Sequence, residues 1–491
     1  MPAMTLDRTE SVLTDPGLES LVDAVVRKTE AGYRIASARG SIDYRRAGDG
    51  FEVVSRDGEP PVNDTVADRP DAAAELANPW ATLGDHATPY AFDHTAQFLD
   101  SDLAPDLAVL HTPTHRFHGN AGEHGSLGIT QSRAPFIAAG PGIVNRGVVD
   151  EHMRMIDVAP TLAALLGCEK IDGVDGVGSP RSGLRLAVQD GNERTEMLDP
   201  GERPDHVVVF LMDGTNNNAL HAAIAEGMAP NIAALAERGA AYRHGLIASL
   251  PTATLANHTT SMTGVHPGRS GILHNTWYDR SCDKSVDLLQ LESMMRACDH
   301  LRTDVETVHE ALHRNRPHAR SVSAFEYADR GSDWSTWAEF RAKRSVSSPG
   351  EDERRRHRHP EFGRESKYRY MSVIDAQSVH HAQRFWDGSM GEPPEFTFVN
   401  FSLTDDIGHF RGPHSEMTRA AITDTDARIG QLLEAVEASG WLDRTTVVVY
   451  ADHGMQQTAE GEPHDLSAVL RNEGIGHRMV DAQYVYLDAT D

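Results

Sequence analysis

Short apolar runs alternate with amphipathic segments along the second half of the chain. Residues 206–214 (HVVVFLMDG), 396–405 (FTFVNFSLTD) and 445–454 (TTVVVYADHG) each have the pattern of a buried strand that stops at an aspartate. Between the last two, residues 416–439 have the apolar spacing of a long amphipathic helix. Buried strands that alternate with helices predict an α/β fold with a mostly parallel sheet and helices on both faces.

The first 167 residues have a mixed α+β pattern. Residues 17–29 have helical apolar spacing, and residues 32–58 resemble short strands joined by glycine turns. Residues 134–140 are typical of a buried strand, and residues 155–167 predict an apolar helix that ends at a glycine. This portion therefore predicts further strands and helices.

Two other stretches differ in composition from their surroundings. Residues 168–204 are rich in glycine, proline and charge, which predicts a linker between a first portion, residues 1–167, and a main α/β portion, residues 205–491. Residues 330–394 hold several aromatic residues and the basic run RRRHRHP at 354–360, and we expect them to be an insertion. Such a run is usually a solvated loop; the alternative is a cap that offers aromatic and arginine side chains to a substrate.

Composition narrows the class of protein. The 491 residues carry 46 Lys and Arg against 73 Asp and Glu, a formal net charge of −27, which argues against a protein that wraps nucleic acid. With 39% hydrophobic residues the chain can build a core. No apolar run is long enough for a membrane span, and the first residues lack the pattern of a signal peptide. Three cysteines without paired spacing favour a reducing, cytoplasmic location.

Acidic and histidine residues follow the apolar strands. Asp213 closes the first run, Asp405 the second and Asp452 the third; His453 comes next, and His409 lies four residues after Asp405. One aspartate at a strand end is usually a turn residue. Three of them at one edge of a parallel sheet, with two histidines, suit zinc or a similar divalent metal, because the acids would otherwise repel one another.

The segment after the first strand supplies hydroxyl and amide groups. Residues 249–279 include Thr252, Thr254, Asn257 and Asn275. A threonine hydroxyl is a poor nucleophile unless a metal or a base lowers its pKa. Taken alone, this threonine-rich stretch also suits the capped start of a helix.

Five short motifs together resemble the alkaline phosphatase superfamily, in particular its type I phosphodiesterase/nucleotide pyrophosphatase branch. They lie between about residues 206 and 455 and are HVVVFLMDG, LPTATLANH, GILHNTWYD, D-x-x-G-H-x-x-G-P-x-S and ADHGM. The resemblance implies an alkaline phosphatase-like fold with two metal ions, expected to be zinc, about 4 Å apart. It also implies a small phosphate-ester substrate.

The resemblance assigns a role to each matching residue. Thr254, the second threonine of P-T-x-T, matches the nucleophile that forms a phospho-threonine, and Asn275 matches the amide that binds a phosphoryl oxygen. The other matching positions imply the metal ligands: Asp213, Thr254, Asp452 and His453 for one ion, and Asp405, His409 and a further histidine for the other.

That further histidine is where the chain departs from the family pattern. The family places it after D-H-G-M and before a glycine, but His464 and His477, the histidines that remain there, are not followed by glycine. The sequence GEHGS near the N-terminus supplies His124 in the expected context instead. His464, neighbours of His124 such as His118, or no third histidine are the alternatives.

A circular permutation explains this departure. The segments that follow His124 resemble the closing strand and helix that the superfamily carries at its C-terminal end. Residues 1–167 would then be the family's C-terminal portion, moved to the front and joined through residues 168–204. Such rewiring is physically simple because the termini of a domain commonly lie close together.

The expected activity is therefore that of a metal-dependent phosphohydrolase. The resemblance favours a phosphodiesterase or nucleotide pyrophosphatase, and the absence of a basic motif near the signatures favours diesters over monoesters. A phosphomonoesterase and a phosphonate hydrolase of the same superfamily are the nearest alternatives. A phosphotransferase and a non-catalytic metal-binding relic are the alternatives from other classes. The sequence does not predict an oligomeric state.

Overall fold

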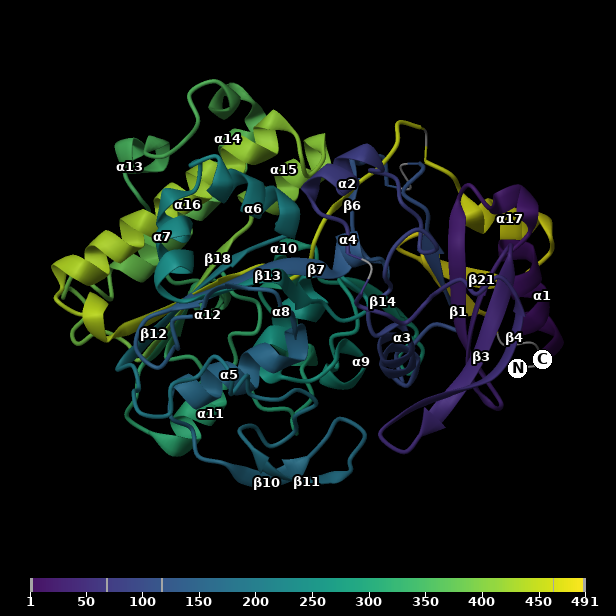
Figure 1. The fold of residues 1–491 in the computed structure, drawn as a ribbon, viewed down its shortest axis with the longest axis horizontal. Helices are drawn as coiled ribbons and strands as arrows, with labels where there is room; N and C mark the ends of the chain where they lie inside the picture. Colours follow the sequence, from purple (N-terminus) through teal and green to yellow (C-terminus); the bar gives the residue numbers. More distant parts are fainter. Residues whose placement is uncertain (1–2, 68, 116–117, 462, 489–491) are drawn as a thin grey trace.

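A central sheet with helices on both faces organises the molecule (Figure 1). The structure is a computed structural model that describes residues 3–67, 69–115, 118–461 and 463–488. Its strand order is β17 (Trp334–Ser335), β16 (Ser321–Ala324), β18 (Phe396–Phe401), β12 (His206–Met212), β19 (Thr445–Tyr450), β7 (Arg133–Ala139), β13 (Ala240–Ile247) and β8 (Gly147–Val149), with β9 (Met153–Arg154) also beside β13. All neighbours run parallel except β7, which is antiparallel to β19 and β13. The predicted α/β class with a mostly parallel sheet is confirmed.

The middle strands are mostly apolar because both faces of the sheet are covered. In β12, Val207 and Val209 belong to the core on one face, whereas Val208 and Phe210 belong to the core on the other. On the first face lie α5 (Val158–Leu165), α8 (Thr254–Thr263) and α11 (Val308–Asn315). The second face is covered by α6 (Asn217–Ala225), α7 (Pro230–Arg238), α14 (Ser366–Gln383) and α16 (Glu416–Ala438). This double coverage is typical of parallel sheets.

A second, antiparallel sheet joins the two ends of the chain, at the right of Figure 1. Its order is β21 (His477–Val480), β22 (Tyr484–Leu487), β5 (Leu107–His111), β1 (Val22–Thr29), β2 (Gly32–Ser37), β3 (Gly40–Ala47) and β4 (Gly50–Gly58). Leu13, at the end of α1 (Ala3–Leu13), packs in one cluster with Leu487. The first helix and the last strand are therefore neighbours.

The prediction of a helix over residues 17–29 is wrong. Residues 22–29 form β1, a central strand of the second sheet, between β5 and β2. Val22 and Val25 pack on one side of this sheet, and Ala24 and Val26 pack on the other. Because both sides of the strand are buried, its apolar residues Val22, Ala24, Val25 and Val26 do not strictly alternate with polar ones, and their spacing imitates that of a helix.

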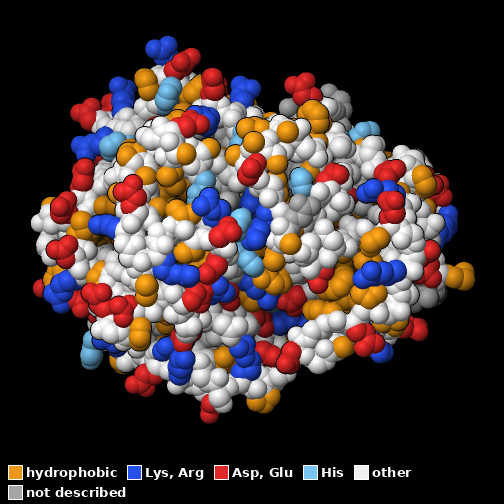
Figure 2. All heavy atoms as spheres, viewed as in Figure 1, with side chains coloured by type: hydrophobic (Ala, Val, Ile, Leu, Met, Phe, Trp, Pro, Cys, Tyr) orange, Lys and Arg blue, Asp and Glu red, His pale blue; other side chains and the backbone are white. Residues whose placement is uncertain are grey.

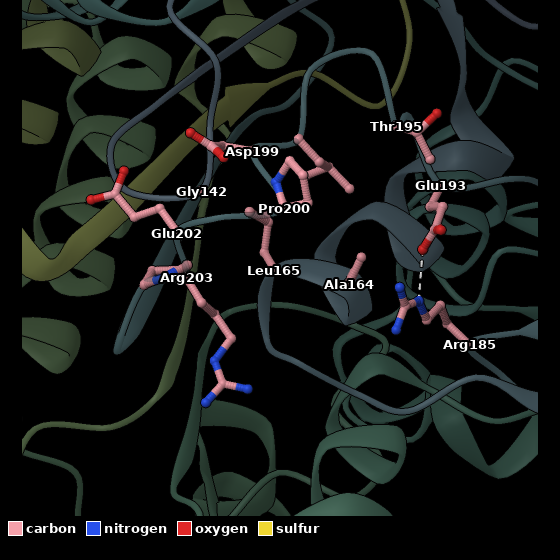
Figure 3. Close-up of a pocket in the computed structure, with 12 residues that line it drawn as sticks. Gly142, Ala164, Leu165, Arg185, Glu193, Thr195, Asp199, Pro200, Glu202 and Arg203 are labelled. Carbon is pink, nitrogen blue, oxygen red and sulfur yellow. Dashed lines mark hydrogen bonds and ion pairs between the residues drawn. The ribbon is translucent and has the colours of Figure 1, made fainter.

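Most other elements of the first portion follow the sequence pattern. Residues 133–139 form β7 inside the central sheet, and α5 ends before Gly167, which has a φ of +71°. Residues 168–204 contain the hairpin of β10 (Ile171–Val174) and β11 (Pro180–Leu184). The rest of that segment packs on the end of α5, where it encloses a cavity of about 310 Å³ (Figure 3).

The insertion at 330–394 folds into helices. They are α12 (Thr336–Arg341), α13 (Glu351–Arg355) and α14. The basic run lies on α13 and the turn after it, and most of its side chains are exposed, which fits a solvated surface. On the face shown in Figure 2, basic and acidic side chains are interspersed rather than gathered into a basic stripe. Within the described ranges, no helix is long and apolar enough to cross a membrane.

Candidate metal centre

Five chain segments bring the predicted ligands to one edge of the central sheet. Asp213 directly follows β12, and Asp452 and His453 follow β19. Asp405 and His409 lie one turn apart on α15 (Leu403–Arg411), so they project from the same face of that helix. The sequence prediction had placed Asp405 at a strand end; the strand stops at residue 401 and the aspartate belongs to the helix.

The histidine from the N-terminal portion reaches the same place through a short strand pair. Residues 122–123 form β6 (Gly122–Glu123), which pairs antiparallel with β20 (Gln456–Gln457). Since β20 follows the D-H-G-M segment, this pairing lays the His124 loop beside Asp452 and His453. The imidazole rings of His124 and His453 stack with centroids 3.8 Å apart.

One group of candidate ligands consists of His124, Asp405 and His409. The Nδ1 atom of His124 donates to the carbonyl of Thr252 at 2.6 Å, and Nδ1 of His409 donates to that of Gly122 at 2.7 Å. A carbonyl only accepts, so both Nδ1 atoms carry the proton. The Nε2 atoms of the two rings face each other across 3.1 Å, so a cation held there would have an imidazole nitrogen from each side.

The carboxylate of Asp405 completes this group. Its Oδ1 atom lies 3.9 Å from Nε2 of His124 and 3.6 Å from Nε2 of His409. Gly214 allows this approach, because a Cβ atom at that position would lie 2.2 Å from Oδ1 of Asp405, and its φ of +61° also favours glycine. Two nitrogens and an oxygen around a common point are a donor set that suits zinc.

The second group surrounds Thr254. Nε2 of His453 lies 3.1 Å from Oδ2 of Asp452, 3.8 Å from Oδ1 of Asp213 and 3.3 Å from Oγ1 of Thr254. The backbone N–H of Gly214 donates to the other oxygen of Asp452 at 3.0 Å, which fixes that carboxylate. These four side chains are the set that the sequence predicted for one ion.

Three buried carboxylate oxygens of the candidate site lack a hydrogen-bond partner in the described part of the molecule, which is expected of atoms that would bind cations. Among the residues that the structure describes, Oδ1 of Asp213, Oδ1 of Asp405 and Oδ2 of Asp452 are buried and accept no hydrogen bond. Burial, then the neighbouring carboxylates of Asp452 and Asp405, raise the pKa of Asp213 well above its ordinary value. Unpaired buried carboxylates are costly, and divalent cations between them would remove that cost.

Thr254 and Asn275 meet at the start of α8. Thr254 is the first residue of the helix and is half-buried. The side-chain oxygen of Asn275 accepts the backbone N–H of Leu255 at 2.9 Å. That bond uses the oxygen of the Asn275 amide, so its NH₂ group is the part that can donate to a ligand, beside a helix N-terminus that favours anions.

The alternative histidines lie in other surroundings. Nε2 of His118 lies 3.4 Å from Oδ1 of Asp481, and the ring of His464 packs edge-on against His115 at 5.6 Å. Over the described part of the chain, neither belongs to a group of three metal-ligating side chains, whereas His124 does. The geometry therefore favours His124 for the position that the sequence left open.

Sequence reasoning missed two buried residues beside the second group, His258 and Glu326. A ring nitrogen of His258 lies within 4.8 Å of carboxylate oxygens of both Asp213 and Asp452, so these three side chains are also a possible metal-binding set. Nδ1 of His258 donates to Oε2 of Glu326 at 2.6 Å, and neither side chain is exposed. His258 closes the motif LPTATLANH and lies four residues after Thr254, so its place on the same helix face was a usable signal. Glu326 follows the short strand β16 and carries no comparable signal.

A cavity of about 520 Å³ opens beside Asp213, Thr254 and Asp405. Its walls are largely aromatic and aliphatic and include Phe325, Tyr327, Trp337, Phe340 and Tyr370. The described residues that line it include no lysine or arginine. The insertion therefore contributes aromatic side chains to the site, as the cap alternative expected, but not its arginines.

Comparison with known proteins gives a family assignment. The family model described as type I phosphodiesterase/nucleotide pyrophosphatase matches residues 207–490, more than half of the chain. An uncharacterized pyrophosphatase/phosphodiesterase of Schizosaccharomyces pombe is 24% identical over 283 residues, which cover 55% of this chain and 49% of that protein. Ectonucleotide pyrophosphatase/phosphodiesterase family member 3 of Rattus norvegicus is 26% identical over 256 residues, 52% of this chain and 25% of that protein.

Solved structures are more distant. Murine ectonucleotide pyrophosphatase/phosphodiesterase 5, as an inactive variant in complex with AMP, is 18% identical with a TM-score of 0.36, over 51% of this chain and 57% of that one. Phosphonoacetate hydrolase from Sinorhizobium meliloti is 20% identical with a TM-score of 0.33, over 51% and 57%.

The matched region covers about half of the Schizosaccharomyces pombe protein and a quarter of the Rattus norvegicus protein. The family model begins at residue 207, so it does not test the circular permutation, which stays a prediction. Over its matched residues, the chain belongs to the type I phosphodiesterase/nucleotide pyrophosphatase family.

Proposed function

We propose that this chain is a phosphodiesterase with two divalent cations, zinc in the simplest case, and with Thr254 as its nucleophile. The observation that carries the proposal is the set of buried, unpartnered carboxylate oxygens and facing imidazole nitrogens around the Thr254 hydroxyl. Asp213, Thr254, Asp452 and His453 would hold one cation, and His124, Asp405 and His409 the other. When bound, the cations would supply the positive charge that activates a hydroxyl and neutralises phosphoryl oxygens.

The side chains of the site then perform a two-step transfer. Oγ1 of Thr254 loses its proton and forms a bond to phosphorus, while the bond from phosphorus to the leaving oxygen breaks and that oxygen takes up a proton to leave as an alcohol. Water hydrolyses the resulting phospho-threonine and restores the hydroxyl. The NH₂ group of Asn275 donates to a nonbridging phosphoryl oxygen, where charge must be stabilised in the transition state.

The cavity supports a diester rather than a monoester. A phosphate monoester carries more negative charge than a diester, and the described residues that line the cavity include no basic side chain to meet that extra charge. Trp337, Phe340 and Tyr370 would instead contact the second organic group of a diester by burying apolar surface. A small phosphate diester with an aromatic or apolar group is therefore the proposed substrate class.

The location proposed for this activity is the cytoplasm. Cys168, Cys282 and Cys298 are all free thiols in the structure, which agrees with a reducing compartment.

We expect zinc-loaded protein to hydrolyse bis-p-nitrophenyl phosphate faster than p-nitrophenyl phosphate. The expected ratio of kcat/KM is at least about tenfold, because the aromatic walls bind the second organic group of the diester in the transition state. Steady-state release of p-nitrophenolate measures both rates in the same buffer. A faster monoester would make the chain a phosphomonoesterase, and carbon–phosphorus cleavage of phosphonoacetate alone would make it a phosphonate hydrolase. If none of these compounds is turned over, the result would favour the alternative that the chain is a non-catalytic metal-binding relic.

A further inference from the structure

His258 and Glu326 form a bonded pair directly behind the second group of candidate ligands. Oε2 of Glu326 accepts from Nδ1 of His258, and Oε1 accepts the backbone N–H of Ala328 at 3.0 Å. Both carboxylate oxygens are therefore engaged, and both side chains are completely buried. The ring of His258 also meets the ring of Tyr327 edge-on, with centroids 4.9 Å apart. These contacts fix the orientation of the imidazole.

The other nitrogen of this imidazole faces the two carboxylates beside Thr254. Nε2 of His258 lies 3.7 Å from Oδ2 of Asp213 and 3.8 Å from Oδ2 of Asp452. This Nε2 atom and Oδ2 of Asp452 have no hydrogen-bond partner within the described ranges. A buried nitrogen thus lies at nearly equal distance from the two acids, at a point that the proposed catalytic steps do not use.

The neighbouring buried carboxylates of Asp213 and Asp452 repel each other, so some group has to hold both of them in the orientation that would bind a cation. A histidine whose second nitrogen is bonded to a carboxylate is a recurrent way to orient the surroundings of a metal. The pair has this arrangement: Glu326 fixes the ring, and the ring presents Nε2 to both acids. Because His258 lies one turn after Thr254 on α8, one helix carries both the nucleophile and this nitrogen.

The backbone before Glu326 fits the same interpretation. Phe325 has a φ of +59°, a conformation that bulky residues rarely adopt. It allows three successive residues after β16 to divide between two sides: Phe325 and Tyr327 line the cavity, whereas Glu326 points inward to His258. Strained residues of this kind persist where the surrounding structure uses them.

We propose that His258, oriented by Glu326, is a positioning residue that holds the carboxylates of Asp213 and Asp452 in the arrangement that binds the cation beside Thr254. The inference rests on the proposed metal centre and adds a role for two residues outside its ligand set. It requires that loss of the pair weakens one cation site and not the other.

Glu326→Gln tests this role with little change in shape, because glutamine supplies only one acceptor oxygen where the pair uses two. Equilibrium dialysis against buffered zinc measures how many ions remain bound at each free concentration. We expect the wild type to bind two ions, and the variant to bind one of them about 10–100-fold more weakly, the loss typical of an outer partner of a metal site. Raising free zinc should then restore kcat, which a packing defect would not allow.

Two further variants make the result specific. His258→Gln removes the ring and should give the same selective loss, which keeps the test open if one substitution lowers folding yield. Glu75→Gln is the matched control, since Glu75 is also buried and accepts from a histidine, Nε2 of His414, at 2.7 Å, but bonds no candidate ligand. The control should bind both ions as the wild type does, with circular dichroism confirming that each variant is folded.

The outcomes separate this inference from the proposed function. If the wild type binds two ions and both pair variants bind them with unchanged affinity, the positioning role is wrong and the metal centre stands. An equal loss in the Glu75 control, or a loss that zinc does not restore, would also overturn the positioning role. A wild type that binds no zinc would remove the metal centre, and the positioning role with it.

Discussion

Thr254→Ala should lower the turnover of a phosphodiester by at least about a thousandfold, the order expected when a catalytic nucleophile is removed. The hydroxyl that it removes is the one that lies 3.3 Å from His453, beside two buried carboxylates. Three other side chains remain to hold the adjacent cation, so zinc content should stay close to that of the wild type. Initial rates with bis-p-nitrophenyl phosphate and zinc analysis of the same samples provide the measurement.

Two controls accompany this variant. Thr254→Ser keeps a hydroxyl at the same position and should retain much of the activity. Thr260→Ala removes a hydroxyl from the same helix and should leave the rate unchanged, because among the described residues Oγ1 of Thr260 bonds only the carbonyl of Ala256. Activity retained in Thr254→Ala would mean that another group attacks phosphorus, whereas inactivity with loss of both zinc ions would mean that the threonine acts only on metal binding.

His124→Ala should release the cation on the Asp405 side and reduce activity by more than the ~10–100-fold that loss of an outer metal partner costs. The substitution leaves Asp405 and His409 as the protein ligands of that group, too few for a tight zinc site. The other cation should remain bound. Zinc stoichiometry by elemental analysis, measured together with the rate, distinguishes a lost ion from a general loss of fold.

His464→Ala is the matched control for this variant, since His464 is the alternative that lies after D-H-G-M in the sequence. Its ring packs against His115 and joins none of the candidate ligand groups on the described residues, so zinc and activity should not change. The reverse result, with zinc lost from the His464 variant and kept by the His124 variant, would return the third ligand to the C-terminal side and contradict the predicted permutation.

Much of the fold could be predicted because both faces of the central sheet are buried. Residues 207–212 and 447–450 are continuous apolar runs for that reason, and each stops before an acidic residue of the site. The same rule misled the prediction at residues 22–29, since a strand buried on both sides has no alternation to separate it from a helix. The end of β18 was also missed, because the sequence does not show where an apolar strand becomes the first turn of α15.

The candidate site was predictable where motif and geometry coincide. Asp405 and His409 have the spacing of one helical turn, and the GEHGS context marked His124 although it lies more than 280 residues before them. Glu326 was not predictable, because its role depends on a fold-dependent meeting between the end of β16 and the middle of α8. The aromatic walls of the cavity depend in the same way on how the insertion packs.

The interleaving of the two chain ends is the physical basis for the permutation hypothesis. β7 lies between β19 and β13 in the central sheet, and β22 pairs with β5 in the second sheet. Residues from both ends therefore build one core rather than two independent domains. This arrangement lets a histidine near the N-terminus serve a site whose other members follow residue 205.

X-ray diffraction at the zinc absorption edge from crystals of the zinc-loaded protein tests the central claim most directly. The account predicts two anomalous peaks about 4 Å apart, the usual two-metal spacing. One peak should lie within coordination distance of His124, Asp405 and His409, and the other beside Thr254, Asp213, Asp452 and His453. Anomalous peaks elsewhere in the molecule, with none between His124 and Asp405, would contradict it.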